Sequence, residues 1–240
     1  MCLAVVAKTR LFGAEFWGAF FYLGHDKFGL MQKDFFMSGI RTTGKKSSNT
    51  LVRDLINVGI FAALYLVLAA ISASIGFIPA FIVVSTCCVA LVTSVPMFLF
   101  YSKIERPVLC CTLLSCFFGG FMMLTGHGIS LGAICIVCGI LMGASLKFIG
   151  KNFAGFLSAN VVLSLVPSSM MLPLWFSTEE YLEYTKMACD DAYVAHLSEL
   201  AKSPWPLIAL YVFGVLGAIV GAFVARRVMK KHFERIGLAK

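Results

Sequence analysis

Charged residues are scarce in this chain. Asp, Glu, Lys and Arg make up 13% of its 240 residues, whereas hydrophobic residues make up 60%. A soluble domain carries about 25% charged residues. The shortage of charge therefore excludes an ordinary soluble domain. Together with a mean hydropathy of +0.90, it predicts an integral membrane protein.

Common enzyme motifs are missing as well. The sequence has no P-loop, no H-E-x-x-H and no G-x-S-x-G. No ionisable residue falls inside an expected span, which argues against a proton- or sodium-coupled pump. We expect no enzyme activity and no intrinsic cofactor. A membrane enzyme acting on lipid would need a nucleophile or an acid–base pair at membrane depth; that class and a structural subunit remain the alternatives.

Neither the charge nor the cysteines indicate another class. The net charge is +8, but the basic residues cluster at span ends, which is typical of membrane topology and contact with anionic lipid rather than of nucleic-acid binding. Of nine cysteines, eight are Cys2 or lie in apolar runs, where free cysteine behaves as a small hydrophobe. Cys135 and Cys138 form a C-x-x-C without the further ligands that a metal site needs, so no disulfide framework or structural metal is expected.

The apolar runs predict an all-α integral membrane protein, a bundle of six transmembrane helices. A span needs roughly 20 residues. The expected spans are 55–76, 80–101, 107–124, 129–146, 153–176 and 206–225, the fifth bent or broken near Pro167 and Pro173. A polar loop, 177–203, precedes the last span. Residues 51–240 form the membrane domain, and residues 1–50 are an N-terminal extension, either an interfacial helix or the result of a start site that really lies at Met31 or Met37.

The basic residues predict the orientation. Six spans put both termini on one side, and that side collects the following cations: Lys45, Lys46, Arg53, Lys103, Arg106, Lys147, Lys151 and the tail after residue 225. The other side holds the turns 76–79 and 125–128 and the loop 177–203, which carries six acids against two lysines. Because Lys and Arg mark the cytoplasmic face, both termini are expected in the cytoplasm.

The expected outer side is rich in methionine, histidine and aromatic residues. It holds five of the eleven methionines and two of the four histidines. Its members are Met122, Met123, Met170, Met171, Met187, His127, His196, Trp175, Tyr181, Tyr184, Tyr193 and Trp205. One interpretation is an aromatic belt with methionine as core filler. The other is a pocket for a flat, largely apolar ligand whose metal takes His, Met or Tyr as axial ligands.

His127 is the centre of the second interpretation. It lies in the turn 125–128 with a glycine on each side, which lets the backbone approach a large ligand closely. Imidazole is a good iron ligand, and His196 could supply a second one from the long loop. The residues expected to bind substrate are His127, Met122, Met123, Met170, Met171, Trp175, Tyr181 and His196, with His127 and His196 as metal ligands. The alternative for His127 is a hydrogen bond that caps the turn.

The first span carries small residues at helical spacing. Gly59 and Ala63 are followed by Ala69 and Ala73, and small-x-x-x-small patterns let helices approach closely in lipid. Gly59 and Ala63 therefore indicate either an interface with another subunit or packing within the bundle.

Several segments together resemble the MptD/Trep-Strep family. They are 53–61, 76–79, 124–128, 163–176 and 230–237, and the likeness covers about residues 50–238. The resemblance implies a multi-pass protein of the bacterial cell membrane, a substrate-binding S component of an energy-coupling factor (ECF) transporter. It also implies an outward-facing pocket and a transmembrane scaffold partner that carries two ATPases. S components dock through A-x-x-x-A in the first helix, and here Gly59 replaces the first alanine of that motif.

From the resemblance and the outer rim we expect a small-molecule importer subunit that topples within its complex. Heme or a related tetrapyrrole is the expected transported ligand, because the rim offers metal ligands. A vitamin or vitamin precursor, which needs no metal ligand, is the alternative within the same class.

Overall fold

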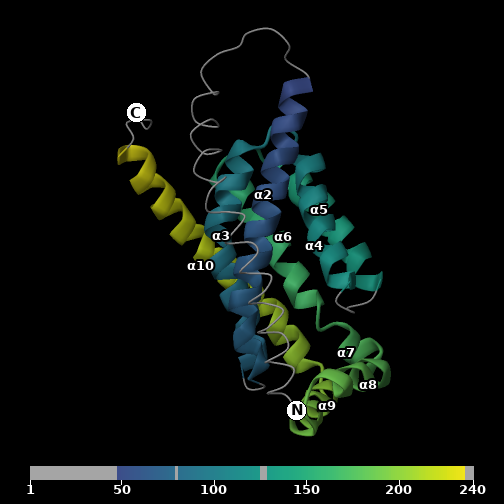
Figure 1. Cartoon of the computed structure of the whole chain (residues 1–240). Coiled ribbons are helices and arrows are strands. Elements are labelled where there is room, and N and C mark those ends of the chain that lie inside the picture. Colours follow the sequence, from purple (N-terminus) through teal and green to yellow (C-terminus); the bar gives the residue numbers. More distant parts are fainter. Residues whose placement is uncertain (1–47, 79–80, 125–128, 236–240) are drawn as a thin grey trace, which may run out of the picture.

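A computed structural model describes residues 48–78, 81–124 and 129–235. All its described elements are helices (Figure 1). Six of them follow an up-and-down path: α2 (Ser48–Ala73), α3 (Ile82–Lys103), α4 (Pro107–Leu124), α5 (Ile129–Phe148), α6 (Phe153–Ser169) and α10 (Trp205–Arg235). A 3-10 turn, η2 (Ser74–Phe77), ends α2. The short helices α7 (Pro173–Phe176), α8 (Thr178–Ala188) and α9 (Asp191–Ala201) connect α6 to α10.

Five helices are long and apolar enough to cross a membrane, namely α2, α3, α4, α5 and α10. This finding confirms a multi-pass helical membrane protein. The fifth predicted span is shorter than expected, because α6 is apolar but has 17 residues. It continues past Pro167, ends at Ser169 and is followed by a separate helix that begins at Pro173. Proline suits a first helical turn because its missing N–H would have no partner there.

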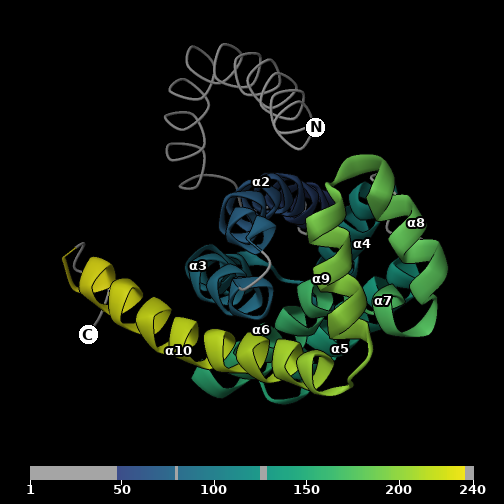
Figure 2. The same cartoon turned by 90° about the horizontal axis from the view of Figure 1, so that it is seen from below.

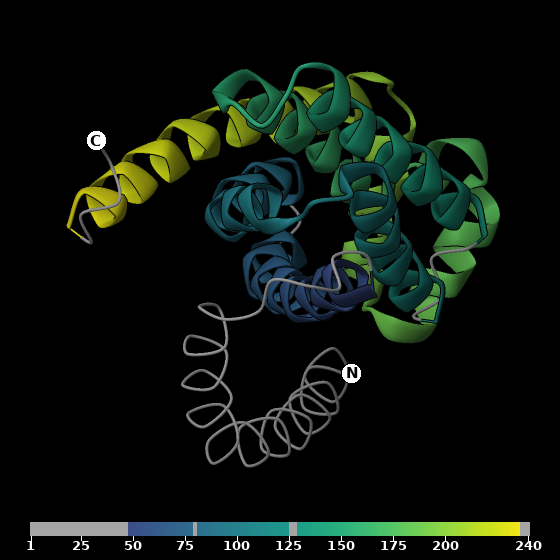
Figure 3. The same cartoon turned by 90° about the horizontal axis from the view of Figure 1, so that it is seen from above.

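The helices pack side by side around a shared core. α3 lies between α2 and α10, α6 contacts α3, α5 and α10, and α4 joins α5 to α2. Viewed from below (Figure 2) and from above (Figure 3), α10 runs along the outside of the bundle and its C-terminal end points away from it. Aromatic side chains fill the centre, where the Phe98 ring meets that of Phe156 edge-on at 5.5 Å and the Tyr65 ring meets that of Phe118 at 5.3 Å.

Glycine allows two helix pairs to approach very closely. On α5, a Cβ added to Gly139 would lie 2.7 Å from Thr112 Cα, so that α5 rests directly on the backbone of α4. On α10, a Cβ added to Gly217 would collide with the carbonyl oxygen of Cys87 on α3. Backbone contacts of this kind are a common way for helices to associate in lipid.

One prediction about a chain segment was wrong. The segment 177–203 was expected to be a polar loop, but it folds into α8 and α9. The last helix, α10, continues beyond the predicted span 206–225 to Arg235. The added residues include Arg, Lys and Met, which favour helix, and cations are stabilising near a helix C-terminus.

Candidate substrate-binding end and partner face

Helices α7, α8 and α9 form a cap on one end of the bundle (Figure 1). This end lies away from Lys103, the last residue of α3, and from the loop that carries Lys151. The cap has an apolar cluster of its own, separate from the main core. Ile82 of α3, Leu174 of α7, Leu197 of α9 and Leu210 of α10 are its buried centre. The cap is therefore attached to the ends of α3 and α10 through packed side chains.

Local signals explain why the polar segment forms helices. Glu179 and Glu180 lie in the first turn of α8 and Lys186 in its last turn, which matches the helix dipole at both ends. The Asp190 side chain accepts a hydrogen bond from the backbone N–H of Tyr193 at 2.9 Å and so caps α9. Val194 and Leu197 form the buried face of α9, and Leu197 belongs to the cap cluster.

Three of the predicted site residues meet in this cap. Tyr181 donates a hydrogen bond from its hydroxyl to Met171 Sδ at 3.3 Å, and Trp175 donates from Nε1 to the carbonyl oxygen of Ser203 at 2.8 Å. All three pack against the cap cluster. Burial raises the pKa of the Tyr181 hydroxyl to about 12, and Tyr193 adds a smaller contribution in the same direction.

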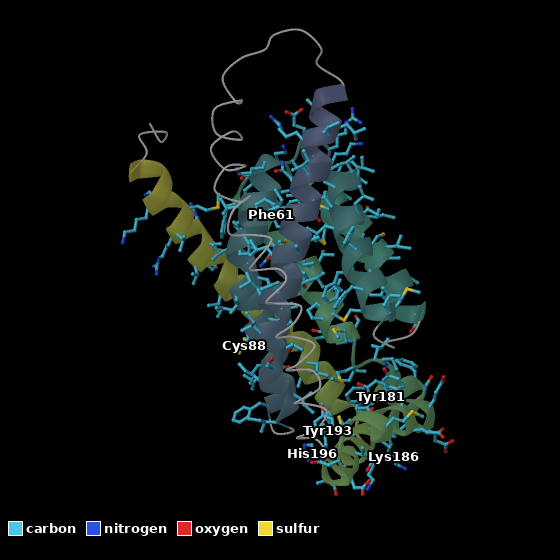
Figure 4. All side chains as sticks on the ribbon, viewed as in Figure 1. Phe61, Cys88, Tyr181, Lys186, Tyr193 and His196 are labelled. Atoms are coloured by element: carbon cyan, nitrogen blue, oxygen red, sulfur yellow. The ribbon has the colours of Figure 1, made fainter. Side chains whose placement is uncertain are left out.

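The other predicted site residues lie elsewhere. Met122 and Met170 are half-buried and pack against the main core. The sulfur of Met123 covers Gly132 of α5. His196 is half-buried on α9, at the same end of the molecule as Tyr181 and Tyr193 (Figure 4). His127 lies outside the described residues.

The described part of the chain contains no group of three or more His, Cys, Asp or Glu side chains that could hold a metal ion. The structure thus brings Met171, Trp175 and Tyr181 together on the cap cluster and places His196 on α9. The other predicted methionines, Met122, Met123 and Met170, lie outside this cluster. Tyr193, which the prediction placed in the rim but not in the site, also packs on the cap cluster.

One face of α2 is open. Gly59 is exposed, and a Cβ added to it would have no neighbour within 4 Å. Leu55, Ile56 and Ile60 on the adjoining turns are exposed by 43–48%. Ala63, one turn along, is half-buried. Among the described residues, no other helix of the bundle packs on the Gly59 surface.

The opposite end of the bundle is tied together by a buried carboxylate. Asp54 is 1% exposed and accepts hydrogen bonds from the backbone N–H groups of Glu105 and Arg106. Arg53 pairs with Glu105 at the surface, 2.6 Å apart. Lys151 donates to the carbonyl oxygen of Ile104. These contacts join α2, the loop between α3 and α4, and the loop between α5 and α6.

A polar seam that the sequence analysis missed runs between α3, α6 and α10. Asn160 is 2% exposed and donates from Nδ2 to Ser94 Oγ at 2.8 Å and to the carbonyl oxygen of Ala218 at 3.0 Å. Thr86 and Ser168 both donate to the carbonyl oxygen of Leu210. An asparagine in an apolar run is the signal that could have indicated it, because polar side chains in a span usually bond across helices.

Fold and composition together define a polytopic helical membrane protein with a capped end. Residues 52–235 match the model of a family described as hypothetical bacterial integral membrane protein (Trep_Strep). The chain belongs to this family and is a multi-pass membrane protein of bacteria. No curated protein and no solved structure matches it.

Proposed function

We propose that this chain is the substrate-capturing membrane subunit of an ECF-type importer, and that a scaffold subunit with two ATPases drives it. The observation that carries the proposal is the open Gly59 surface on α2. Exposed apolar side chains surround a backbone that a partner helix could approach directly. The helices that the structure describes leave this position uncovered.

The capped end is where we place capture. With α6 as the sixth and shortest span, both ends of the described chain, Ser48 and Arg235, lie on the side of Arg106 and Lys151. We place this side in the cytoplasm, because cations gather there. The cap of α7, α8 and α9 is then external. Its aromatic and thioether side chains suit a flat, largely apolar ligand.

For the substrate we propose heme or a related tetrapyrrole, with His127 and His196 as iron ligands and the rim methionines as further contacts. Purified protein mixed with heme should develop a Soret band. His196→Ala and His127→Ala should each shift or weaken it. A spectrum unchanged in both single variants and in the double variant would reject histidine ligation.

A vitamin or vitamin precursor is the second candidate, and one contact favours it. Met171 Sδ accepts a hydrogen bond from the Tyr181 hydroxyl, and Trp175 Nε1 donates one to the carbonyl oxygen of Ser203. The thioether and the hydroxyl, which are the two possible metal ligands here, therefore bond to each other. An organic ligand needs only the apolar surface that they form. Mass spectrometry of the ligand that co-purifies with the chain distinguishes the two candidates.

The partner surface has its own test. Gly59→Leu should reduce co-purification of the scaffold subunit and reduce uptake, while ligand binding by the isolated chain remains. Gly120→Leu is the matched control, since Gly120 on α4 is also exposed with no neighbour within 4 Å. Equal loss with both variants, or no loss with Gly59→Leu, would contradict a partner at this face.

A further inference from the structure

The C-terminal third of α10 carries a basic surface that the bundle does not cover. Ala225 is the last buried residue of α10 as far as residue 231, where the described side chains end. Beyond it, Arg226, Arg227, Lys230 and Lys231 are all exposed. Figures 1 and 3 show this part of α10 extending away from the other helices, and Figure 4 shows nitrogen-ended side chains along it.

These cations continue an apolar stripe on one outward face. Leu216, Val220 and Phe223 are 50–51% exposed, and Arg227 and Lys231 follow at the same helical spacing of three or four residues. The buried side of the helix, formed by Gly217, Ala218, Gly221, Ala222 and Ala225, faces the opposite way. One continuous face therefore changes from apolar to cationic at a single point along the helix.

The position of that change matches the thickness of a bilayer. Trp205, 72% exposed, begins α10, and tryptophan favours the membrane–water interface. From Trp205 to Arg226 the helix rises about 31 Å at 1.5 Å per residue, against a hydrocarbon core of about 30 Å. The first cation thus lies where hydrocarbon gives way to lipid headgroups.

One of the cations is held in place by an aromatic ring. Arg226 Cζ lies 4.6 Å from the centre of the Phe153 ring, and that ring also contacts Phe223 at 5.3 Å. Phe153 begins α6, so the start of the basic surface is fixed to the bundle.

We propose that Arg226, Arg227, Lys230 and Lys231 form a docking surface for the anionic phospholipid headgroups of the adjoining leaflet. Acyl chains cover the apolar stripe, and the cations that continue it bind headgroup phosphates. Lipid is favoured over an acidic protein because the cations lie on the same face of α10 as Leu216, Val220 and Phe223, which contact acyl chains. This inference does not depend on the proposed function, since it involves neither substrate nor scaffold.

The test uses the full chain in a neutral detergent and measures retained lipid by native mass spectrometry. Phosphatidylglycerol and phosphatidylcholine are titrated in parallel. The wild-type chain should prefer phosphatidylglycerol, and the double variant Arg227→Gln/Lys231→Gln should lower that preference about thirtyfold, since each cation near a lipid surface contributes about 1 kcal/mol. The control, Lys186→Gln/Lys202→Gln, removes the same charge from the exposed surface near the cap and should leave the preference unchanged.

Two outcomes would overturn the proposal: no preference for phosphatidylglycerol in the wild-type chain, or equal losses in the two double variants. A photo-crosslinking residue at position 227 in cell membranes adds a check that needs no detergent. Lipid adducts support the proposal. Adducts with protein alone would contradict it and would indicate that the cations bind an acidic protein. Unchanged helical circular dichroism shows that the variants remain folded.

Discussion

The carboxylate of Asp54 on α2 accepts a hydrogen bond from the backbone N–H of Arg106, 3.1 Å away, just before α4 begins at Pro107. It also accepts from the N–H of Glu105. Both N–H groups precede the first residue of α4, so the hydrogen bonds of that helix do not use them. Asp54 therefore supplies their acceptor from another helix.

Removing this acceptor should destabilise the bundle. In Asp54→Ala the two backbone N–H groups lose a charged partner at a partly buried place. A hydrogen bond to a charged group typically contributes about 1.5–3 kcal/mol. Asp54→Asn keeps one acceptor oxygen and should cost less. Thermal unfolding of the purified protein in detergent measures both effects as a fall in Tm.

Arg53→Gln is the control for this experiment. It breaks the ion pair with Glu105, but both side chains are about half exposed. Exposed pairs contribute about 0–1 kcal/mol. The Tm of Arg53→Gln should therefore stay close to that of the wild type, and an equal fall for Arg53→Gln and Asp54→Ala would contradict a special role for the buried carboxylate.

A second prediction concerns the contact of α10 with α3. In Gly217→Ala the new methyl group would meet the backbone of Cys87, so the two helices must separate. Overpacking of this kind costs about 1–3 kcal/mol. Gly59→Ala adds the same methyl group where nothing lies within 4 Å. Because alanine favours a helix interior more than glycine does, unfolding in detergent should show a lower Tm for Gly217→Ala and an equal or higher Tm for Gly59→Ala.

Much of the fold follows from hydropathy alone. The predicted span 107–124 coincides with α4, and the neighbouring spans differ from α3 and α5 by a few residues, because charged loops and the turn between them limit the apolar runs. Helices α8 and α9 were missed because hydropathy detects only apolar segments. These two segments are rich in polar residues. For α9, the helical signal comes instead from Asp190, which caps the helix, and from the buried residues Val194 and Leu197, which are one helical turn apart.

The site was less predictable, because the spacing of residues along the sequence does not show which side chains of different helices lie next to each other. Methionine and aromatic content indicated the cap, and Met171, Trp175 and Tyr181 do meet there. The same content gave no means of separating them from Met122 and Met170, which pack on the main core. The first span was expected to begin at residue 55, but α2 begins at Ser48. Asp54 therefore lies within the helix, and its carboxylate is buried in the bundle.

The third prediction uses the raised pKa of Tyr181. The hydroxyl has a pKa of about 12 in the folded chain because it is buried, against about 10 for an unfolded chain. The protonated form is thus favoured by folding. The stability that this hydroxyl contributes is complete below pH 10 and is lost as the pH rises to about 12.

Nuclear magnetic resonance of tyrosine labelled at the ring Cζ measures this titration directly. One resonance should titrate near pH 12 and should vanish in Tyr181→Phe. Tyr184, which is 49% exposed on the same helix, offers the control variant Tyr184→Phe, in which the late titration should remain. A Tyr181 resonance that titrates near pH 10 would show that the hydroxyl is in water and that the cap is not packed as described.

The last prediction concerns orientation. Lys186 on α8 and Lys147 near the end of α5 are both exposed and lie at opposite ends of the bundle. If the basic end is cytoplasmic, then a membrane-impermeant maleimide added to intact cells should modify Lys186→Cys and leave Lys147→Cys unmodified. The modified position is identified by mass spectrometry of the peptide that contains it, so the native cysteines do not interfere. Permeabilised cells should give modification of both variants, which shows that each thiol is reachable. The reverse pattern in intact cells would place the cap in the cytoplasm, and substrate capture from outside by α7, α8 and α9 would then be wrong.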